Sequence, residues 1–152
     1  MVIGAVGSGK TSLLMALNGE SGDAAKTQAL KYTALSIDTP GEYVENPSMY
    51  KALLATAPEA GCIMFTQDSA ARFSVFPPGF AGSFSRMSIG IITKTDHERS
   101  DRKKAEKHLK GLGLKGPIFE VSAHTGEGIE KLRDYISTVC NKVDETNGEE
   151  GI

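Results

Sequence analysis

Residues 1–11 read Met-Val-Ile-Gly-Ala-Val-Gly-Ser-Gly-Lys-Thr, and from Gly4 onward they match the pattern G-x-x-x-x-G-K-[ST]. Three apolar residues precede the pattern, and the helix-compatible run of residues 12–17 follows it. A strand, a glycine-rich turn and a helix are the context in which this pattern forms a phosphate-binding loop, or P-loop. The stretch therefore predicts a site for nucleotide phosphates at the start of the chain.

The chemistry of a P-loop accounts for each residue type in the pattern. Glycine lets backbone N–H groups curl around phosphate oxygens, because no Cβ stands in the way. The N-terminus of the following helix adds partial positive charge beside them. Lys10 would reach the β- and γ-phosphates and act in catalysis, and the Thr11 hydroxyl would ligate Mg²⁺. The residues predicted to bind the phosphates are Gly4, Gly7, Ser8, Gly9, Lys10, Thr11 and Ser12.

Composition argues against several other classes of protein. The 152 residues fit one domain, and a net charge of −2 gives no basic surface for nucleic acid or an anionic membrane. No run approaches the roughly 18 apolar residues of a membrane span. Because the P-loop leaves no room for a signal peptide, we expect a cytoplasmic protein. Cys62 lies in an apolar run, which favours a reduced core cysteine.

Strand-like and helix-like segments alternate along the rest of the chain. The expected strands are residues 35–38, 61–66, 87–93 and 118–121. The expected helices are residues 47–57, 100–109 and 127–142. This alternation predicts a three-layer α/β P-loop NTPase fold, with a mostly parallel sheet of five to six strands and helices on both faces. Residues 1–143 would form the domain, and the acidic tail 144–152 is expected to be disordered.

Residues 68–86 do not fit a regular helix, because two prolines and two glycines interrupt them. The segment contains Phe73, Phe76, Phe80 and Phe84. These side chains could form an exposed docking patch, or they could cover the sheet as an irregular part of the core. We favour the core interpretation, with the docking patch as the alternative.

Further motifs follow the P-loop in a fixed order. Thr27 lies in a polar loop, and residues 38–41, Asp-Thr-Pro-Gly, fit D-x-x-G after a strand. Residues 93–96, Thr-Lys-Thr-Asp, are similar to [NT]-K-x-D, and residues 122–124, Ser-Ala-His, follow the last strand. This order resembles the translation-factor-type G domains, the class of GTPases that includes Ras and Era. The resemblance implies a small G domain.

The resemblance also implies the cofactors GTP or GDP and Mg²⁺. Thr27 would join Mg²⁺ when a γ-phosphate is present, although it also fits an ordinary loop residue. Asp38 would hold Mg²⁺ through water, and the Gly41 N–H would sense the γ-phosphate. These assignments make Thr11, Thr27 and Asp38 the candidate metal residues.

The base-reading motif favours guanine on chemical grounds. A carboxylate at Asp96 can accept hydrogen bonds from the ring N–H and the exocyclic amine of guanine, and adenine offers no such donor pair. The stem of Lys94 would lie along the base. By the same resemblance, Ser122 and Ala123 belong to the last of these motifs. The Ala123 N–H would donate to the guanine carbonyl.

A closer match within that class is the EutP/PduV family of small P-loop proteins. It rests on residues 26–29 (Lys-Thr-Gln-Ala), 37–43 (Ile-Asp-Thr-Pro-Gly-Glu-Tyr) and 76–80 (Phe-Pro-Pro-Gly-Phe). The family is associated with bacterial ethanolamine and propanediol utilisation. The resemblance implies a role at metabolic microcompartments, with a shell or pathway protein as partner besides the guanine nucleotide.

Two features depart from the Ras-like pattern. Glu42 follows D-x-x-G where Ras-like proteins carry a water-orienting glutamine; because a γ-phosphate repels a carboxylate, Glu42 could point away from it or act as a base. No arginine lies next to Thr27 as an internal finger, which predicts slow GTP hydrolysis. The candidate catalytic residues are Lys10, Thr27, Gly41 and Glu42. The histidines at 97, 108 and 124 lack metal or triad spacing and are expected on the surface.

A P-loop also serves kinases, so a second function stays open. An ATP-dependent metabolite kinase would pass phosphate to a small acceptor such as a carboxylate. Asp96 argues for guanine and against this alternative, and no clear acceptor site is present in the sequence. The favoured hypothesis is therefore a GTP-binding switch or assembly factor.

Overall fold

The computed structural model describes residues 1–19 and 41–150, and a parallel sheet forms its centre. The four strands are β1 (Val2–Ile3), β2 (Cys62–Asp68), β3 (Met87–Thr93) and β4 (Ile118–Glu120), in the order β1-β2-β3-β4. The register pairs Val2 with Met64, Cys62 with Met87 and Gly90 with Ile118. Because every pairing is parallel, all four strands end at the same edge of the sheet.

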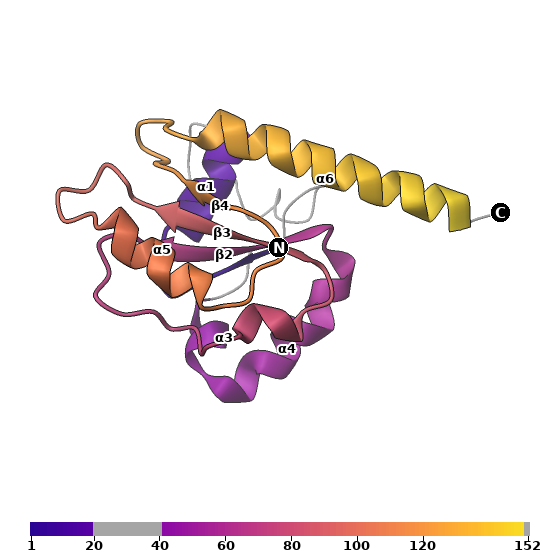
Figure 1. Ribbon diagram of the computed structural model, residues 1–152, viewed down its shortest axis with the longest axis horizontal. Coiled ribbons are helices and arrows are strands. Elements are labelled where there is room, and N and C mark those ends of the chain that lie inside the picture. The colour runs from indigo at the N-terminus through magenta and orange to yellow at the C-terminus, as the bar shows by residue number, and fades with distance from the viewer. Residues whose placement is uncertain (20–40, 151–152) are drawn as a thin grey trace.

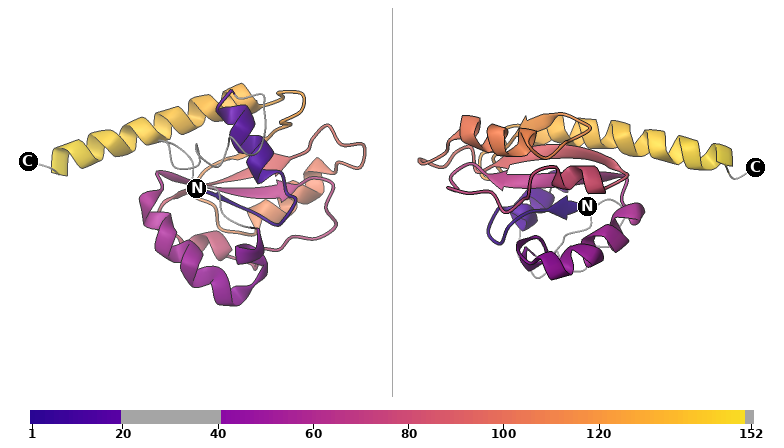
Figure 2. Two further views of the ribbon diagram at one scale, coloured as in Figure 1. Left: turned by 180° about the vertical axis from the view of Figure 1, so that it is seen from behind. Right: turned by 60° about the horizontal axis from the view of Figure 1, so that its bottom comes forward.

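Helices cover both faces of this sheet, so the expected three-layer α/β fold is confirmed. The helices are α1 (Lys10–Leu17), α3 (Glu42–Glu45), α4 (Tyr50–Thr56), α5 (Arg102–Lys110) and α6 (Ile129–Glu150). The described residues also form three 3-10 turns: η1 (Pro47–Met49) between α3 and α4, η2 (Ala57–Glu59) between α4 and β2, and η3 (Phe80–Ser83) between β2 and β3. Helices α1 and α6 pack on one face, and α3, α4 and α5 lie on the other (Figures 1 and 2).

Each face of the sheet has its own apolar core. On the α1 and α6 side, Val2, Met64 and Ile91 pack against Leu13 and Leu132. On the opposite side, the core contains Ile3, Ile63, Phe65, Ile92, Leu53 and Leu109. Successive residues of a strand point to opposite faces, and here both faces are buried. That is why β2 and β3 are continuous apolar runs rather than alternating ones.

The phenylalanine-rich segment belongs mainly to the core, as favoured from the sequence. Phe76, Phe80 and Phe84 are buried and surround Phe65 of β2, with ring centroids 5.5, 6.0 and 5.6 Å from it. All three rings meet Phe65 nearly edge to face, a favourable arrangement of aromatic quadrupoles. Phe73 differs, because it is 81% exposed.

Several element boundaries differ from the sequence expectation. The helix expected over residues 47–57 is divided, because Pro47 opens η1 and Pro58 lies in η2, with α4 between them. The sheet has four strands among the described residues, so five to six strands are not confirmed. The strand expected at residues 35–38 lies outside the described part of the chain.

The last helix is longer than the sequence analysis expected. It was expected to end at residue 142, with a disordered tail from residue 144, but α6 continues to Glu150. No proline interrupts residues 143–150, and extending an existing helix costs far less than nucleating one. The end of α6 projects well beyond the sheet (Figure 1).

An arginine of α6 completes the carboxyl end of α1. The Arg133 Nε donates to the Leu17 carbonyl oxygen at 2.8 Å, and its Nη2 donates to the Ala16 oxygen at 2.8 Å. Carbonyls at the end of a helix lack partners within the helix, and a cation there also complements the helix dipole. Arg133 therefore fixes the helix that follows the P-loop to the final helix.

We predict that Arg133→Ala lowers stability by about 1 kcal/mol, the typical net value of a hydrogen bond, because the bonds lie at the surface. The midpoint of thermal unfolding should fall by about 2–4 °C for a chain of this size. Lys131→Ala is the control, because Lys131 is exposed on the same helix. Equal midpoints for the two variants would contradict this role for Arg133.

Candidate functional site

Three loops meet where the parallel strands end. The loop after β1 carries residues 4–9, the loop after β3 begins at Lys94, and the loop after β4 begins at Val121. In open α/β sheets, ligands bind at this carboxyl edge. Figure 1 shows α1 leaving the sheet at the same edge.

The glycine pattern of the first loop has a direct structural reason. Gly7 has φ 75° and Gly9 has φ 93°, values in the left-handed region where glycine is strongly favoured. Gly4 is buried against the side chain of Thr66 on β2, and a Cβ at this position would collide with the Thr66 hydroxyl. The Ser8 hydroxyl lies 3.0 Å from the same Thr66 oxygen. The sequence motif did not point to Thr66, because it lies on a different strand.

The side chain of Lys10 lies across the loop that precedes it. Lys10 is buried, and its Nζ donates to the carbonyl oxygens of Gly4 at 2.8 Å and Ala5 at 2.7 Å. Thr11 is half-buried in the first turn of α1, and Ser12 beside it is exposed. The ammonium group is therefore already placed at the phosphate loop.

Gly41 is the described part of the D-x-x-G motif, and it packs directly on the P-loop. A Cβ at Gly41 would collide with the backbone nitrogen of Val6 and would come 2.7 Å from the Val6 Cα. The Val6 nitrogen donates weakly to Glu45 Oε1 of α3 at 3.4 Å. Thr27 and Asp38 lie outside the described residues.

We predict that Gly41→Ala disrupts the phosphate loop, because a methyl group has no room beside the Val6 backbone. Overpacking of this kind costs about 1–3 kcal/mol, measurable as a lower midpoint of urea unfolding. Gly82→Ala is a matched control, because a Cβ there would meet no atom within 4 Å. The prediction fails if both alanine variants unfold at the same urea concentration.

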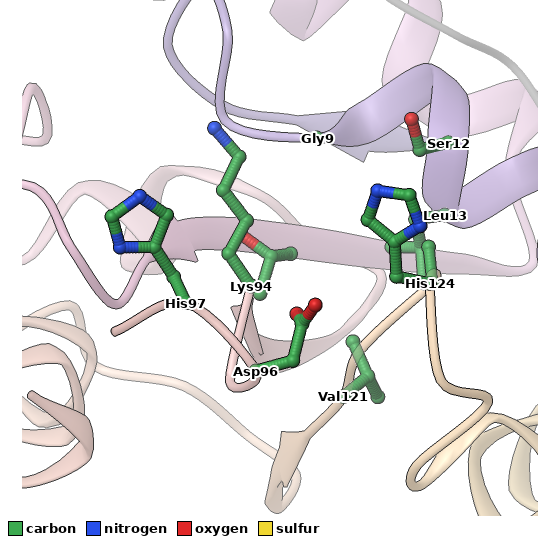
Figure 3. A pocket seen from close by; sticks show the side chains of 10 residues that line it. Gly9, Ser12, Leu13, Lys94, Asp96, His97, Val121 and His124 are labelled. Carbon is green, nitrogen blue, oxygen red and sulfur yellow. The ribbon is translucent and has the colours of Figure 1, made fainter. Parts of the chain in front are cut away.

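A cavity of about 240 Å³ lies next to the phosphate loop. Its lining residues are Gly9, Ser12, Leu13, Thr93, Lys94, Asp96, His97, Val121, Ala123 and His124. Figure 3 shows Lys94 extending toward the loop that carries Gly9, with Asp96 near its base and His124 beside Ser12. The structure thus brings the P-loop, the Lys94–Asp96 segment and the Ser122–His124 segment together around one cavity.

Residues 93 and 94 connect the end of β3 to the P-loop. Thr93 Oγ1 donates to the Ser8 oxygen at 2.6 Å, and Lys94 Nζ donates to the Gly7 oxygen at 2.6 Å. Lys94 also forms an ion pair with Asp68 Oδ2 at 3.0 Å. The sequence analysis did not identify Asp68, because the sequence does not show that the last residue of β2 lies beside Lys94.

Asp96 is exposed at the mouth of the cavity, and a buried serine orients it. The hydroxyl of Ser122 donates to Asp96 Oδ1 at 2.8 Å. This hydrogen bond lowers the pKa of the Asp96 carboxyl below its ordinary value, and His124 and His97 act in the same direction. At neutral pH the carboxyl is therefore ionised and able to accept hydrogen bonds.

A further network joins the two loops that carry Asp96 and Ser122. Thr95 Oγ1 donates to Glu127 Oε2 at 3.1 Å, and Arg102 binds both oxygens of Glu127 at 2.7 and 3.2 Å. The hydrogen bonds from Arg102 lower the pKa of the Glu127 carboxyl, and they are its main influence. Glu127 is another residue that the sequence analysis missed, because its partner lies 25 positions away.

Two expectations about the remaining groups can be compared with the structure. His97 and His124 are exposed, as expected, but both line the cavity, a role the sequence analysis did not give them. His108 departs from the expectation, because it is half-buried on α5 and its Nε2 is buried. Cys62 is buried in the core, as favoured. Among the described residues, no group of three or more His, Cys, Asp or Glu side chains could hold a metal ion. Thr11 is the one candidate metal residue in this part of the chain.

We predict that Ser122→Ala raises the pKa of Asp96, because the ionised carboxyl loses its principal hydrogen-bond donor. The charged form of Asp96 persists above its pKa and is lost as the pH falls through it, so the variant should lose it at higher pH. Carbon-13 NMR titration of the carboxyl measures this shift. Ser137→Ala, on the exposed side of α6, should leave the titration unchanged, and an unchanged curve for Ser122→Ala would refute the assignment.

These features define a class of protein. A glycine-rich loop joins a strand to a helix at the carboxyl edge of a parallel sheet, and the loops after β3 and β4 close a cavity beside it. The chain has the α/β fold and the phosphate-loop arrangement of the P-loop protein class. Within the described residues, no helix has both the length and the apolar character needed to span a membrane.

Comparison with known proteins identifies the family. Residues 1–138 match the PduV-EutP family, described as ethanolamine utilisation - propanediol utilisation, and the chain belongs to this family. The propanediol utilization protein PduV of Citrobacter freundii is 40% identical over 138 residues, which cover 90% of this chain and 91% of that protein. The probable acetate kinase EutP of Salmonella typhimurium is 34% identical over 145 residues, which cover 94% and 91% of the two chains.

More distant similarity places the fold among GTPases. The GTPase Era of Maricaulis maris is 27% identical over 171 residues, covering 90% of this chain and 54% of Era. The crystal structure of the bacterial selenocysteine-specific elongation factor EF-Sec superposes with a TM-score of 0.62 and 23% identity, covering 93% of this chain and 28% of EF-Sec. The small GTPase-like fold expected from the motif order is therefore confirmed.

Proposed function

We propose that this protein binds GTP and GDP in the cavity between the P-loop and the segment from Lys94 to Asp96, and that it hydrolyses GTP slowly. The observation that carries the proposal is the position of the Asp96 carboxyl, which accepts a hydrogen bond from Ser122 at 2.8 Å and lines the same cavity as Gly9 of the P-loop. A base beside Asp96 and phosphates over the P-loop would together occupy this arrangement.

Selectivity for guanine follows from the charge on Asp96. An ionised carboxylate accepts hydrogen bonds and donates none, so it suits the ring N–H and exocyclic amine of guanine. Adenine presents an acceptor nitrogen at the ring position, which would leave the carboxylate unpaired. Lys94 would support one side of the base with its stem. The Ala123 backbone N–H, which follows the buried Ser122, is the proposed donor to the guanine carbonyl.

The phosphates would lie over the P-loop, held by its backbone N–H groups and by Lys10. The amine of Lys10 would turn from the carbonyl oxygens of Gly4 and Ala5 toward the β- and γ-phosphates. Thr11, together with Thr27 and Asp38 outside the described residues, would hold Mg²⁺, which would supply positive charge to the phosphates. The Gly41 N–H would contact the γ-phosphate, because Gly41 already packs on the backbone of Val6 in the P-loop.

Two features of the sequence support slow hydrolysis. Glu42 stands where Ras-like GTPases carry a water-orienting glutamine, and a carboxylate there would be repelled by the γ-phosphate. The sequence around Thr27 provides no arginine that could stabilise charge in the transition state. The protein would therefore act as a nucleotide-dependent switch in ethanolamine or propanediol utilisation. A microcompartment shell or pathway protein in the cytoplasm would be its partner.

A second candidate function is ATP-dependent phosphorylation of a small carboxylate. The observation that favours it is the name of the EutP relative, probable acetate kinase. The two functions differ in the base they require, because only the first depends on the carboxylate of Asp96.

We predict that calorimetry in the presence of Mg²⁺ finds GTP and GDP bound at least tenfold more tightly than ATP, since each unmet buried polar contact costs about 1–3 kcal/mol. Asp96→Asn should weaken GDP and favour xanthosine diphosphate, because an amide can donate to the 2-oxo group of xanthine. The control is Asp134→Asn on α6, which removes an exposed carboxylate that does not line the cavity. Preference of the unmodified protein for ATP, or transfer of its γ-phosphate to acetate, would favour the kinase.

A further inference from the structure

Lys94 has an unusual backbone conformation that the surrounding residues maintain. Its φ is 57°, and it is the only residue other than glycine with a positive φ among the described residues. Left-handed conformation costs a residue with a Cβ about 1–2 kcal/mol, so it persists only where neighbours impose it. The Lys94 carbonyl oxygen accepts from the Ser69 hydroxyl at 3.0 Å and from the His97 N–H at 2.9 Å.

The side chain of Lys94 is held at its other end by Asp68. Asp68 Oδ2 lies 3.0 Å from Lys94 Nζ, which also donates to the Gly7 carbonyl of the P-loop. The second carboxyl oxygen, Oδ1, accepts from the Ala70 N–H at 2.8 Å. That hydrogen bond orients the carboxylate toward Lys94. The carboxylate is only 19% exposed, so solvent screens the ion pair incompletely.

Ser69 follows Asp68 and attaches the turn after β2 to β3 and α5. It is 2% exposed, its N–H donates to the Thr93 oxygen at 3.1 Å, and its oxygen accepts from the Asp101 N–H at 2.8 Å. Asp68 thus contacts the side chain of Lys94, and Ser69 contacts its backbone. Neither residue lines the cavity.

We propose that Asp68 is a positioning residue for nucleotide recognition, acting through Lys94, with Ser69 fixing the backbone from which Lys94 extends. The proposal rests on the proposed function, because it assigns Lys94 to the side of a bound base. Without the Asp68 charge, the Lys94 ammonium would turn toward the nucleotide phosphates, and its stem would leave the base. Asp68 therefore keeps the base pocket and the Gly7 end of the phosphate loop aligned.

A double-mutant cycle tests the proposal by GDP calorimetry with Mg²⁺ on the full chain. The variants are Asp68→Asn, Lys94→Met, the combination of both, and Asp134→Asn as an exposed carboxylate control on α6. Asp68→Asn keeps an oxygen for the Ala70 N–H, so it preserves the turn. It should weaken GDP binding about tenfold, as expected for one charge-assisted hydrogen bond, and the combined variant should bind no more weakly than Lys94→Met alone.

Three results would overturn the proposal. If Asp68→Asn binds GDP as tightly as the unmodified protein, or if the effects of the two substitutions multiply, Asp68 does not act through Lys94. If the unmodified protein binds no guanine nucleotide, the proposed function fails and this inference fails with it. Asp68→Glu retains the charge and should recover part of the lost affinity. A substitution that acted only on stability would lower the unfolding midpoint and leave the cycle additive.

Discussion

The parallel pairing of the four strands is the constraint on which the rest of the structure depends. Because β1, β2, β3 and β4 all run the same way, the loops after β1, β3 and β4 emerge at one edge and can share a cavity. The pairing also requires both faces of the sheet to be covered, which the two apolar cores achieve. The P-loop and the cavity beside it are thus consequences of the parallel arrangement of the strands.

Polar contacts, rather than apolar packing, align the loops with one another at that edge. Thr93 reaches the Ser8 carbonyl, Lys94 reaches the Gly7 carbonyl, and Ser122 reaches the Asp96 carboxylate. Hydrogen bonds of this kind require narrow ranges of distance and angle, so they fix positions more strictly than contacts between apolar side chains. Such placement is needed where a ligand must meet donors on two loops at once.

Much of this site could be predicted from the sequence, because its motifs are local. The P-loop needs glycines at fixed spacing, and Gly7 and Gly9 have the left-handed φ that explains them. Lys94, Asp96 and Ser122 directly follow buried segments, so their place at the sheet edge could be read from the alternation of strands and helices. Thr66, Asp68 and Glu127 could not be found in this way. Their partners lie on other strands or loops, and only the register of the folded sheet brings them together. The helix expected over residues 47–57 has 3-10 turns at its two ends, which apolar periodicity does not distinguish from α-helix.

The bond between Arg133 and the end of α1 has a consequence for the order of events during synthesis. The two partners are separated by 116 positions, so α1 leaves the ribosome long before its carbonyl groups can be capped. At about 5–20 residues per second, the interval is on the order of ten seconds. During that time the helix next to the phosphate loop also lacks Leu132, part of the core it shares with α6. The carboxyl end of α1 is therefore capped, and its shared core with α6 completed, only after α6 has been synthesised.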